Sequence, residues 1–160
     1  MNIFVLSYDV EECAKWHLDK HVVKMPLETA QLLCTALWYH GGKPLYKKAH
    51  KNHPCNLWTR ESQANFNWLV ALGFSLCSEY QYRYGKTHKC LEVLDDCKKQ
   101  SVLLPEFPFS EPPQAMPDEY KRESVIEAYR AYYIGGKKNI ASWKGREKPF
   151  WWRSEDGDRS

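Results

Sequence analysis

The chain has 160 residues, a formal net charge of +3, 43% hydrophobic and 14% aromatic residues. This composition supplies a hydrophobic core and excludes wholesale disorder, and the length fits one domain. No stretch approaches the roughly 18 apolar residues of a membrane span, and the first residues lack the basic lead of a signal peptide. Six cysteines without CxxC or zinc-finger spacing suit a reducing compartment. We therefore expect a cytoplasmic protein.

The first half of the chain predicts two long helical regions. Residues 3–6 form a short apolar run that can be either a strand or a buried arm. A helical region follows over about 11–39, and Pro26 inside it predicts a kink or a break near Met25. After a basic loop, Pro54 suits the first turn of a second helix that continues to about residue 84.

The second half predicts two shorter helices and long connections. A third helix is expected over about 87–99, followed by a proline-rich connection to residue 117 that packs on the body of the protein. Ser124 and Glu127 form a capping box at the start of a helix to Ile134. We predict a single all-α domain over residues 1–153, a helical bundle with a short N-terminal arm or strand and long basic or proline-rich connections. Residues 154–160 are predicted to form a polar C-terminal tail.

One face of the first helical region carries nearly all of its ionisable side chains. At about 100° per residue, seven polar side chains fall within roughly 60° of one direction: His17, Lys20, His21, Lys24, Glu28, Gln31 and Thr35. The rest of the circumference is mostly apolar, with Asp19 as the one charged exception. A surface helix normally shows the reverse, so this pattern predicts a buried helix whose polar file lines an active site. Imidazole, amine and carboxylate groups can exchange protons or act as nucleophiles there. The alternative is a solvated strip of i,i+4 ion pairs. The candidate catalytic residues are His17, Asp19, Lys20, His21, Lys24 and Glu28.

His17 and His21 also have the spacing of two metal ligands on one helix face. The glutamate that follows the first histidine in zincins is absent, however, and Lys20 and Lys24 would repel a cation. We therefore predict no metal and no other cofactor. A metal hydrolase that uses the two histidines is kept as an alternative.

Two basic segments predict a surface for a polyanion. Residues 40–60 contain five lysines and arginines and no acid, and residues 135–153 contain six against Glu147. Aromatic residues alternate with cations over 80–89 and 143–153, which suits base stacking and phosphate contacts, although such aromatics can also belong to the core. The predicted nucleic-acid-binding residues are Lys47, Lys48, Lys51, His53, Arg60, Tyr82, Arg83, Lys86, His88, Trp143, Lys144, Arg146 and Trp151.

These features together resemble the phage-type pyrimidine dimer DNA glycosylases, which are small all-α proteins without a metal. The resemblance rests on the apolar arm that leads to Ala14-Lys-Trp-His17-Leu18, on Pro26 nine positions after that histidine, and on the aromatic, basic C-terminal tail. A His53-Pro54 turn at the start of the second long helix is also similar. The resemblance implies base flipping, attack on the sugar by the N-terminal amine to give a Schiff base, help from a glutamate on the first helix, and strand cleavage at the abasic site.

The chain departs from this family pattern at two positions. Family members expose a threonine amine after removal of methionine, whereas Asn2 follows Met1 here. The family's glutamate aligns nearer to Lys24 than to Glu28. If Met1 is retained, its own amine is the nucleophile that the resemblance implies, and Lys24 can take its place. The alternative is that no such nucleophile exists and the site performs different chemistry on a pyrimidine.

We predict an enzyme that acts on pyrimidine bases in duplex DNA carrying a damaged or modified pyrimidine. The first hypothesis is a pyrimidine dimer-type DNA glycosylase and AP lyase that works through base flipping and a Schiff base. One alternative is a phage-style transferase or modification enzyme that acts on thymine or hydroxymethyluracil in DNA. The other is a non-catalytic nucleic-acid-binding protein. No membrane partner is expected.

Overall fold

Helices account for all the regular secondary structure in the described part of this computed structural model, residues 1–100 and 104–153. The α-helices are α1 (Val10–Trp16), α2 (Asp19–Tyr39), α3 (Pro54–Glu61), α4 (Gln63–Tyr84), α5 (Leu91–Lys99) and α6 (Val125–Gly136), and the short 3₁₀ helices are η1 (Asp118–Tyr120) and η2 (Lys138–Ile140). The predicted all-α fold is confirmed. The predicted polar tail, residues 154–160, lies outside the described residues.

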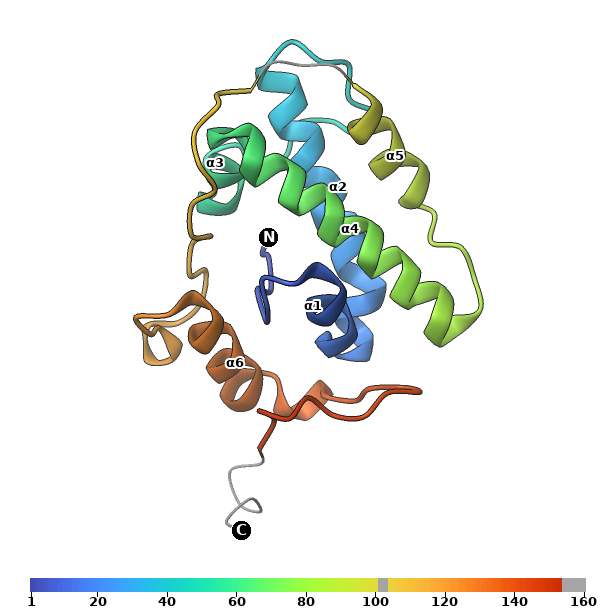
Figure 1. Ribbon diagram of the computed structural model, residues 1–160, viewed down its shortest axis with the longest axis vertical. Coiled ribbons are helices and arrows are strands. Elements are labelled where there is room, and N and C mark those ends of the chain that lie inside the picture. Colours follow the sequence, from blue (N-terminus) through green and yellow to red (C-terminus); the bar gives the residue numbers. More distant parts are fainter. Residues whose placement is uncertain (101–103, 154–160) are drawn as a thin grey trace.

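The long helices α2 and α4 form the centre of the protein (Figure 1). Helices α3 and α5 pack against both of them, and α1 packs on α4. The side chains between them, such as Leu33, Leu69 and Leu76, are completely buried, and this removal of apolar surface from water is the main stabilising contribution to the fold. Helix α6 lies beyond the end of a long connection (Figure 1). None of the helices described here has the length and apolar character needed to cross a membrane.

The first helical region breaks in a place that the sequence did not indicate. Helix α2 runs without interruption through Pro26, so of the predicted kink or break near Met25 the break is wrong. The chain instead leaves the helix at His17 and Leu18, which both have extended backbone. The amide of Asp19, the first residue of α2, donates to the carbonyl of Ser142 at 2.8 Å. The amide of Asp19 is thus hydrogen-bonded to a residue far away in the sequence, and helical periodicity alone could not predict this contact.

The second helical region also divides in two. The sequence predicts one helix from Pro54 to Tyr84, but Ser62 has extended backbone and separates α3 from α4. Its hydroxyl accepts from the amide of Asn65 at 3.0 Å, which makes Ser62 the N-cap of α4. Helix α4 ends where expected, at Gly85, whose φ of 67° is the left-handed conformation that glycine adopts easily.

Residues 3–6 form a buried arm and not a strand. All four side chains are 5% exposed or less. Figure 1 shows the N-terminus between α3 and α6, and the amide of Asn2 donates to the carboxylate of Glu28 on α2 at 2.9 Å. The arm therefore brings the first two residues of the chain beside α2.

Candidate active site and polyanion-binding surface

A pocket of about 540 Å³ opens where the N-terminal arm, α2, the start of α3 and the region of α6 meet. It brings amines, imidazoles and a carboxylate together from segments that are far apart in the sequence. The lining residues are Met1, Asn2, Phe4, His21, Lys24, Glu28, His53, Pro54, Gln114, Ala115, Met116, Lys121, Tyr132 and Lys137.

The carboxylate of Glu28 lies between two amines in this pocket. Its Oε1 is 3.6 Å from the amine of Met1, and its Oε2 is 3.2 Å from Nζ of Lys24, one helical turn earlier on α2. Oε1 also accepts from the amide of Asn2 at 2.9 Å. Only 7% of Glu28 is exposed, so its carboxylate is held in one place and can exchange a proton with either amine.

The side chain of Asn2 fixes the position of the first residues. Its Nδ2 donates to the carbonyl of Ala115 at 2.9 Å, and its Oδ1 accepts from the hydroxyl of Tyr129, a fully buried residue of α6, at 2.9 Å. The amide of Ile3 turns back to the same Oδ1 at 2.7 Å. The amine of Met1 is thus positioned by contacts with the last helix.

His21 forms part of the pocket wall in a tightly packed setting. Its ring stacks on Phe4, with the centroids 4.2 Å apart and the planes at 25°, and its Nδ1 lies 2.7 Å from the hydroxyl of Tyr133. Burial, with contributions from His17, Lys137 and Lys24, lowers the pKa of His21 to about 2. The imidazole is therefore neutral at physiological pH.

Three of the predicted catalytic residues lie elsewhere. His17 is completely buried in the break between α1 and α2, and its Nδ1 donates to the carbonyl of Cys13 at 2.7 Å. Burial lowers the pKa of His17 to about 4, so this ring is also neutral. Asp19 faces the C-terminal region, and Lys20 is exposed to solvent outside the pocket lining. Of the predicted catalytic residues, the structure places only His21, Lys24 and Glu28 in the pocket lining. Because the helix is broken between Trp16 and Asp19, His17 does not continue the polar face of α2.

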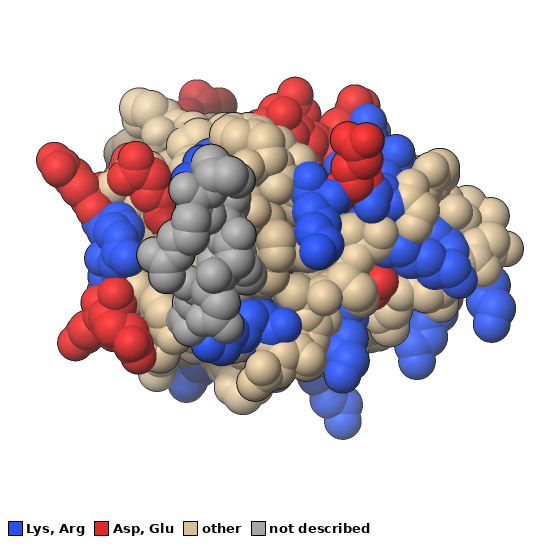
Figure 2. Space-filling view, turned by 90° about the horizontal axis from the view of Figure 1, so that it is seen from below, with Lys and Arg blue, Asp and Glu red and all other residues tan. Residues whose placement is uncertain are grey.

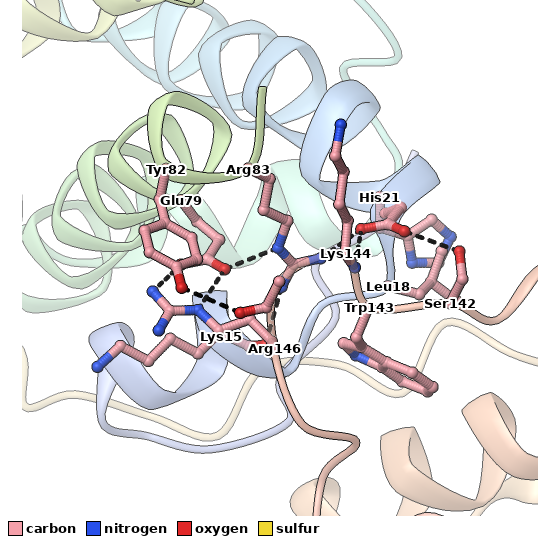
Figure 3. A network of polar contacts seen from close by, with 12 residues as sticks. Lys15, Leu18, His21, Glu79, Tyr82, Arg83, Ser142, Trp143, Lys144 and Arg146 are labelled. Atoms are coloured by element: carbon pink, nitrogen blue, oxygen red, sulfur yellow. Dashed lines mark hydrogen bonds and ion pairs between the residues drawn. The ribbon is translucent and has the colours of Figure 1, made fainter. Parts of the chain in front are cut away.

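A network of polar contacts joins α2, α4 and the C-terminal strap, which we define as residues 142–146 (Figure 3). Asp19 of α2 belongs to this network. Asp19 accepts from Arg83 at 2.9 Å, and Arg83 also donates to Glu79 at 2.7 Å. Asp19 further accepts from the hydroxyl of Ser142 and from the amide of Lys144. The Arg83 side chain has no exposed surface. Its predicted place on a DNA-binding face is corrected by this burial, because its charge is already used inside the protein.

Three more predicted DNA-binding residues are also buried. His88 donates from Nε2 to the carbonyl of Val23 at 2.9 Å, in the turn before Pro26, and its Nδ1 accepts from the amide of Cys90. Trp143 donates to the carbonyl of Trp16 at 2.8 Å. Trp151 is 8% exposed. These side chains attach loops and the C-terminal segment to the core, and the structure corrects their predicted contact with nucleic acid.

The other predicted binding residues remain at or near the surface. Lys47, Lys48, Lys51, Lys86 and Lys144 are exposed, and Arg60 and Arg146 are partly exposed. Two aromatic side chains, Trp38 and Tyr39, accompany the basic loop, since Nζ of Lys48 lies 3.7 Å from the Trp38 ring centre and Arg60 lies over Tyr39. Tyr82 is 56% exposed with Arg146 against its ring. Figure 2 shows lysines and arginines along the lower and right sides of one face, with most acids at its top and left.

His53 has a double role. Its Nδ1 accepts from the amide of Cys55 at 3.0 Å, so it is the N-cap of α3, and it also lines the pocket. The far wall of the pocket was missed by sequence reasoning. It contains Gln114, Lys121, Tyr132 and Lys137, and of these only Lys137 carried a signal, as part of a basic segment. Within the described part of the chain, no three His, Cys, Asp or Glu side chains are grouped as a metal site would require.

Comparison with known proteins adds one finding. Residues 1–92 match the family model described as pyrimidine dimer DNA glycosylase. The chain matches no curated protein and no solved structure. The matched region contains the N-terminal arm, Lys24, Glu28 and His53, whereas the pocket wall formed by residues 114–137 lies beyond it.

Proposed function

The chain belongs to the pyrimidine dimer DNA glycosylase family, and on this basis we propose that it excises a damaged pyrimidine from DNA through a Schiff base and then cleaves the strand. The observation that carries this proposal is the position of Glu28, whose two carboxylate oxygens lie 3.6 Å from the amine of Met1 and 3.2 Å from Nζ of Lys24. A nucleophilic amine and a group that moves its proton are the two parts that such chemistry requires.

The reaction starts with a nucleotide that is flipped out of the duplex into the pocket. A neutral amine attacks C1′ of the sugar, the bond from C1′ to N1 of the base breaks, and its electron pair leaves with the base. Glu28 takes the proton that the amine loses, and the base anion takes a proton from water after the bond has broken. The sugar ring then opens to an imine. Because the imine acidifies the C2′ hydrogen, loss of that proton expels the 3′-phosphate and cuts the strand.

We propose the amine of Met1 as the nucleophile. The Met1 side chain is 3% exposed, and the amide of Asn2 shares Oε1 of Glu28, so this amine stays beside the carboxylate. The Lys24 side chain is 68% exposed, and its ammonium group is better placed to meet a phosphate at the pocket entrance. Lys121 and Lys137 carry positive charge on the opposite wall. DNA is the partner that such a pocket and the exposed lysines of the basic loop would bind.

Borohydride trapping tests the proposal directly. The full chain is incubated with duplex DNA that is ultraviolet-irradiated, contains hydroxymethyluracil, or is undamaged, and borohydride then reduces any imine to a stable adduct. We expect an adduct with irradiated DNA alone. Salt-sensitive binding without an adduct on any of the three would contradict the Schiff base and favour base modification or simple DNA binding.

The nucleophile is identified in the same experiment. The intact mass shows whether Met1 is present, and peptide mapping locates the reduced sugar. The variant Lys24→Arg keeps a positive charge but cannot form an imine with a sugar, so it should still give an adduct at Met1. Loss of the adduct in this variant, with mapping to Lys24 in the unaltered chain, would transfer the role to Lys24.

A further inference from the structure

The hydrogen bond between His21 and Tyr133 determines which nitrogen of His21 carries a proton. A tyrosine hydroxyl donates one hydrogen bond and accepts up to two. The hydroxyl of Tyr133 accepts from the amide of Leu18 at 3.3 Å and lies 2.7 Å from Nδ1 of His21. Tyr133 is completely buried, and Nδ1 is the only acceptor for its hydrogen that the described residues supply. Since a buried donor without an acceptor is costly, Tyr133 donates to Nδ1 and the proton of His21 resides on Nε2.

The surroundings of His21 maintain this neutral tautomer. One face of the ring is covered by Phe4, and the cations that act on it are Lys24 on α2 and Lys137 after α6. His17 contributes in the same direction, and together with burial these groups lower the pKa of His21 far below neutrality. The ring is therefore a fixed donor with Nδ1 engaged inside the protein, and Nε2 is the ring nitrogen left for the pocket that His21 lines.

We propose that His21 is a catalytic residue that donates a hydrogen bond from Nε2 to a carbonyl oxygen of the departing pyrimidine. When the bond between C1′ and N1 breaks, the electron pair moves to N1 and is shared with the neighbouring O2. A donor placed at this oxygen stabilises the developing negative charge, and its proton stays on His21. Cationic Lys24 and Lys137 both line the pocket and both act electrostatically on His21, so their positive charges favour the same developing negative charge. This inference rests on the proposed glycosylase function and assigns the group that assists the leaving base.

Two substrates separate departure of the base from imine formation. Duplex DNA with a single cyclobutane pyrimidine dimer requires both steps, whereas duplex DNA with a preformed abasic site requires only the imine. In His21→Phe the ring remains available to stack on Phe4 but has no donor. In His21→Gln an amide oxygen can still accept from Tyr133 while the amide N–H faces the pocket.

Single-turnover rates on the dimer substrate are expected to fall about 100-fold in His21→Phe, the usual effect of removing one donor to a developing oxyanion. Borohydride trapping on the abasic substrate is expected to change by less than about threefold, which also shows that the variant folds. On the dimer substrate, His21→Gln should react at least about tenfold faster than His21→Phe, because its amide restores a donor. Tyr133→Phe, which removes the group that fixes the tautomer, should slow only the dimer reaction, by a smaller factor than His21→Phe.

Equal slowing of both substrates in His21→Phe, or no slowing of either, would overturn this role for His21. If His21→Gln were no faster than His21→Phe on the dimer substrate, this role would also be contradicted, because the hydrogen-bond donor would then have no effect on the rate. If the unaltered chain traps neither substrate, the glycosylase proposal itself fails, and this result is distinguishable because it needs no variant.

Discussion

Glu79 and Arg146, 67 positions apart in the sequence, form an ion pair with two parallel hydrogen bonds. Nε of Arg146 donates to Oε2 of Glu79 and Nη2 donates to Oε1, each at 3.0 Å. Burial raises the pKa of the Glu79 carboxyl, but the hydrogen bonds and positive charges of Arg146 and Arg83 lower it by more. The pKa of Glu79 is therefore below its usual value. This pair attaches the C-terminal strap to α4.

Replacing Arg146 with alanine should lower the free energy of unfolding by about 1–3 kcal/mol, because it removes two charge-assisted hydrogen bonds and the contact with the Tyr82 ring. Urea unfolding followed by circular dichroism measures the change. Lys148→Ala is the matched control, since Lys148 is an exposed cation of the same region and should change stability by less than about 0.5 kcal/mol. Equal effects of the two variants would show that the Glu79 pair contributes nothing specific.

The stability of the protein should fall as the pH drops from about 6.5 to 4. The pKa of His17 is lowered to about 4 by burial, so the unfolded chain takes up a proton in this range before the folded protein does. The stabilisation is complete above pH 6.5 and decreases by about 3 kcal/mol toward pH 4. His21 acts in the same direction. Urea titrations at several pH values give the free energy of unfolding as a function of pH. This free energy should depend less steeply on pH in His17→Asn, whose side chain does not titrate in this range, and an unchanged dependence would refute the assignment to His17.

Glu28→Gln should reduce single-turnover excision about 10²–10⁴-fold, because the amide cannot accept the proton that the attacking amine loses. DNA affinity measured by fluorescence anisotropy should stay equal or become tighter, since a negative charge has left a pocket that contains several lysines. Glu92→Gln, at an exposed position on α5, serves as the charge-matched control and should leave the excision rate unchanged. If Glu28→Gln retained full activity, the proposed proton transfer would be wrong.

The exposed lysines of the basic loop should contribute to DNA affinity in a salt-dependent way. For each phosphate contact that is lost, the slope of log affinity against log salt should decrease by about one. We expect a decrease of up to about two for Lys47→Ala combined with Lys51→Ala, both on this exposed loop. Lys99→Ala on α5, where the lysine pairs with Asp95, should not change the slope. A loss of affinity that does not depend on salt would contradict phosphate contacts.

The sequence predicted those parts of the fold that depend on neighbouring residues. Pro54 begins α3 and Gly85 ends α4 as expected, because proline suits a first helical turn and glycine adopts a positive φ. His21, Lys24 and Glu28 were placed together correctly because they share one helix, whose period relates them directly. The breaks at His17 and Ser62 interrupt an otherwise helical pattern, and they were missed because the amides that follow them have distant partners. The amide of Asp19 donates to the carbonyl of Ser142, and that of Gln63 donates to the carbonyl of Pro105, each at 2.8 Å.

Relationships between distant segments could not be predicted in the same way. Arg83 looked like a surface cation in a basic run, yet its partner Asp19 lies 64 positions earlier. No local periodicity reports such a pairing. The wall formed by Gln114, Tyr132 and Lys137 reaches the pocket through the packing of α6 and the connection before it, and a proline-rich connection shows no pattern from which this placement follows.

The link between Asn2 and Tyr129 has a consequence for synthesis of the protein. A ribosome delivers the two partners 127 positions apart, so the first residues to emerge are among the last to reach their final place. A product interrupted before α6 would contain every residue that matches the family model and would lack the Tyr129 hydroxyl that binds Asn2, while the contacts of Glu28 with Met1 and Asn2 would remain. We therefore expect the proposed excision activity to be complete only once translation has passed α6 and Tyr129 can bind Asn2.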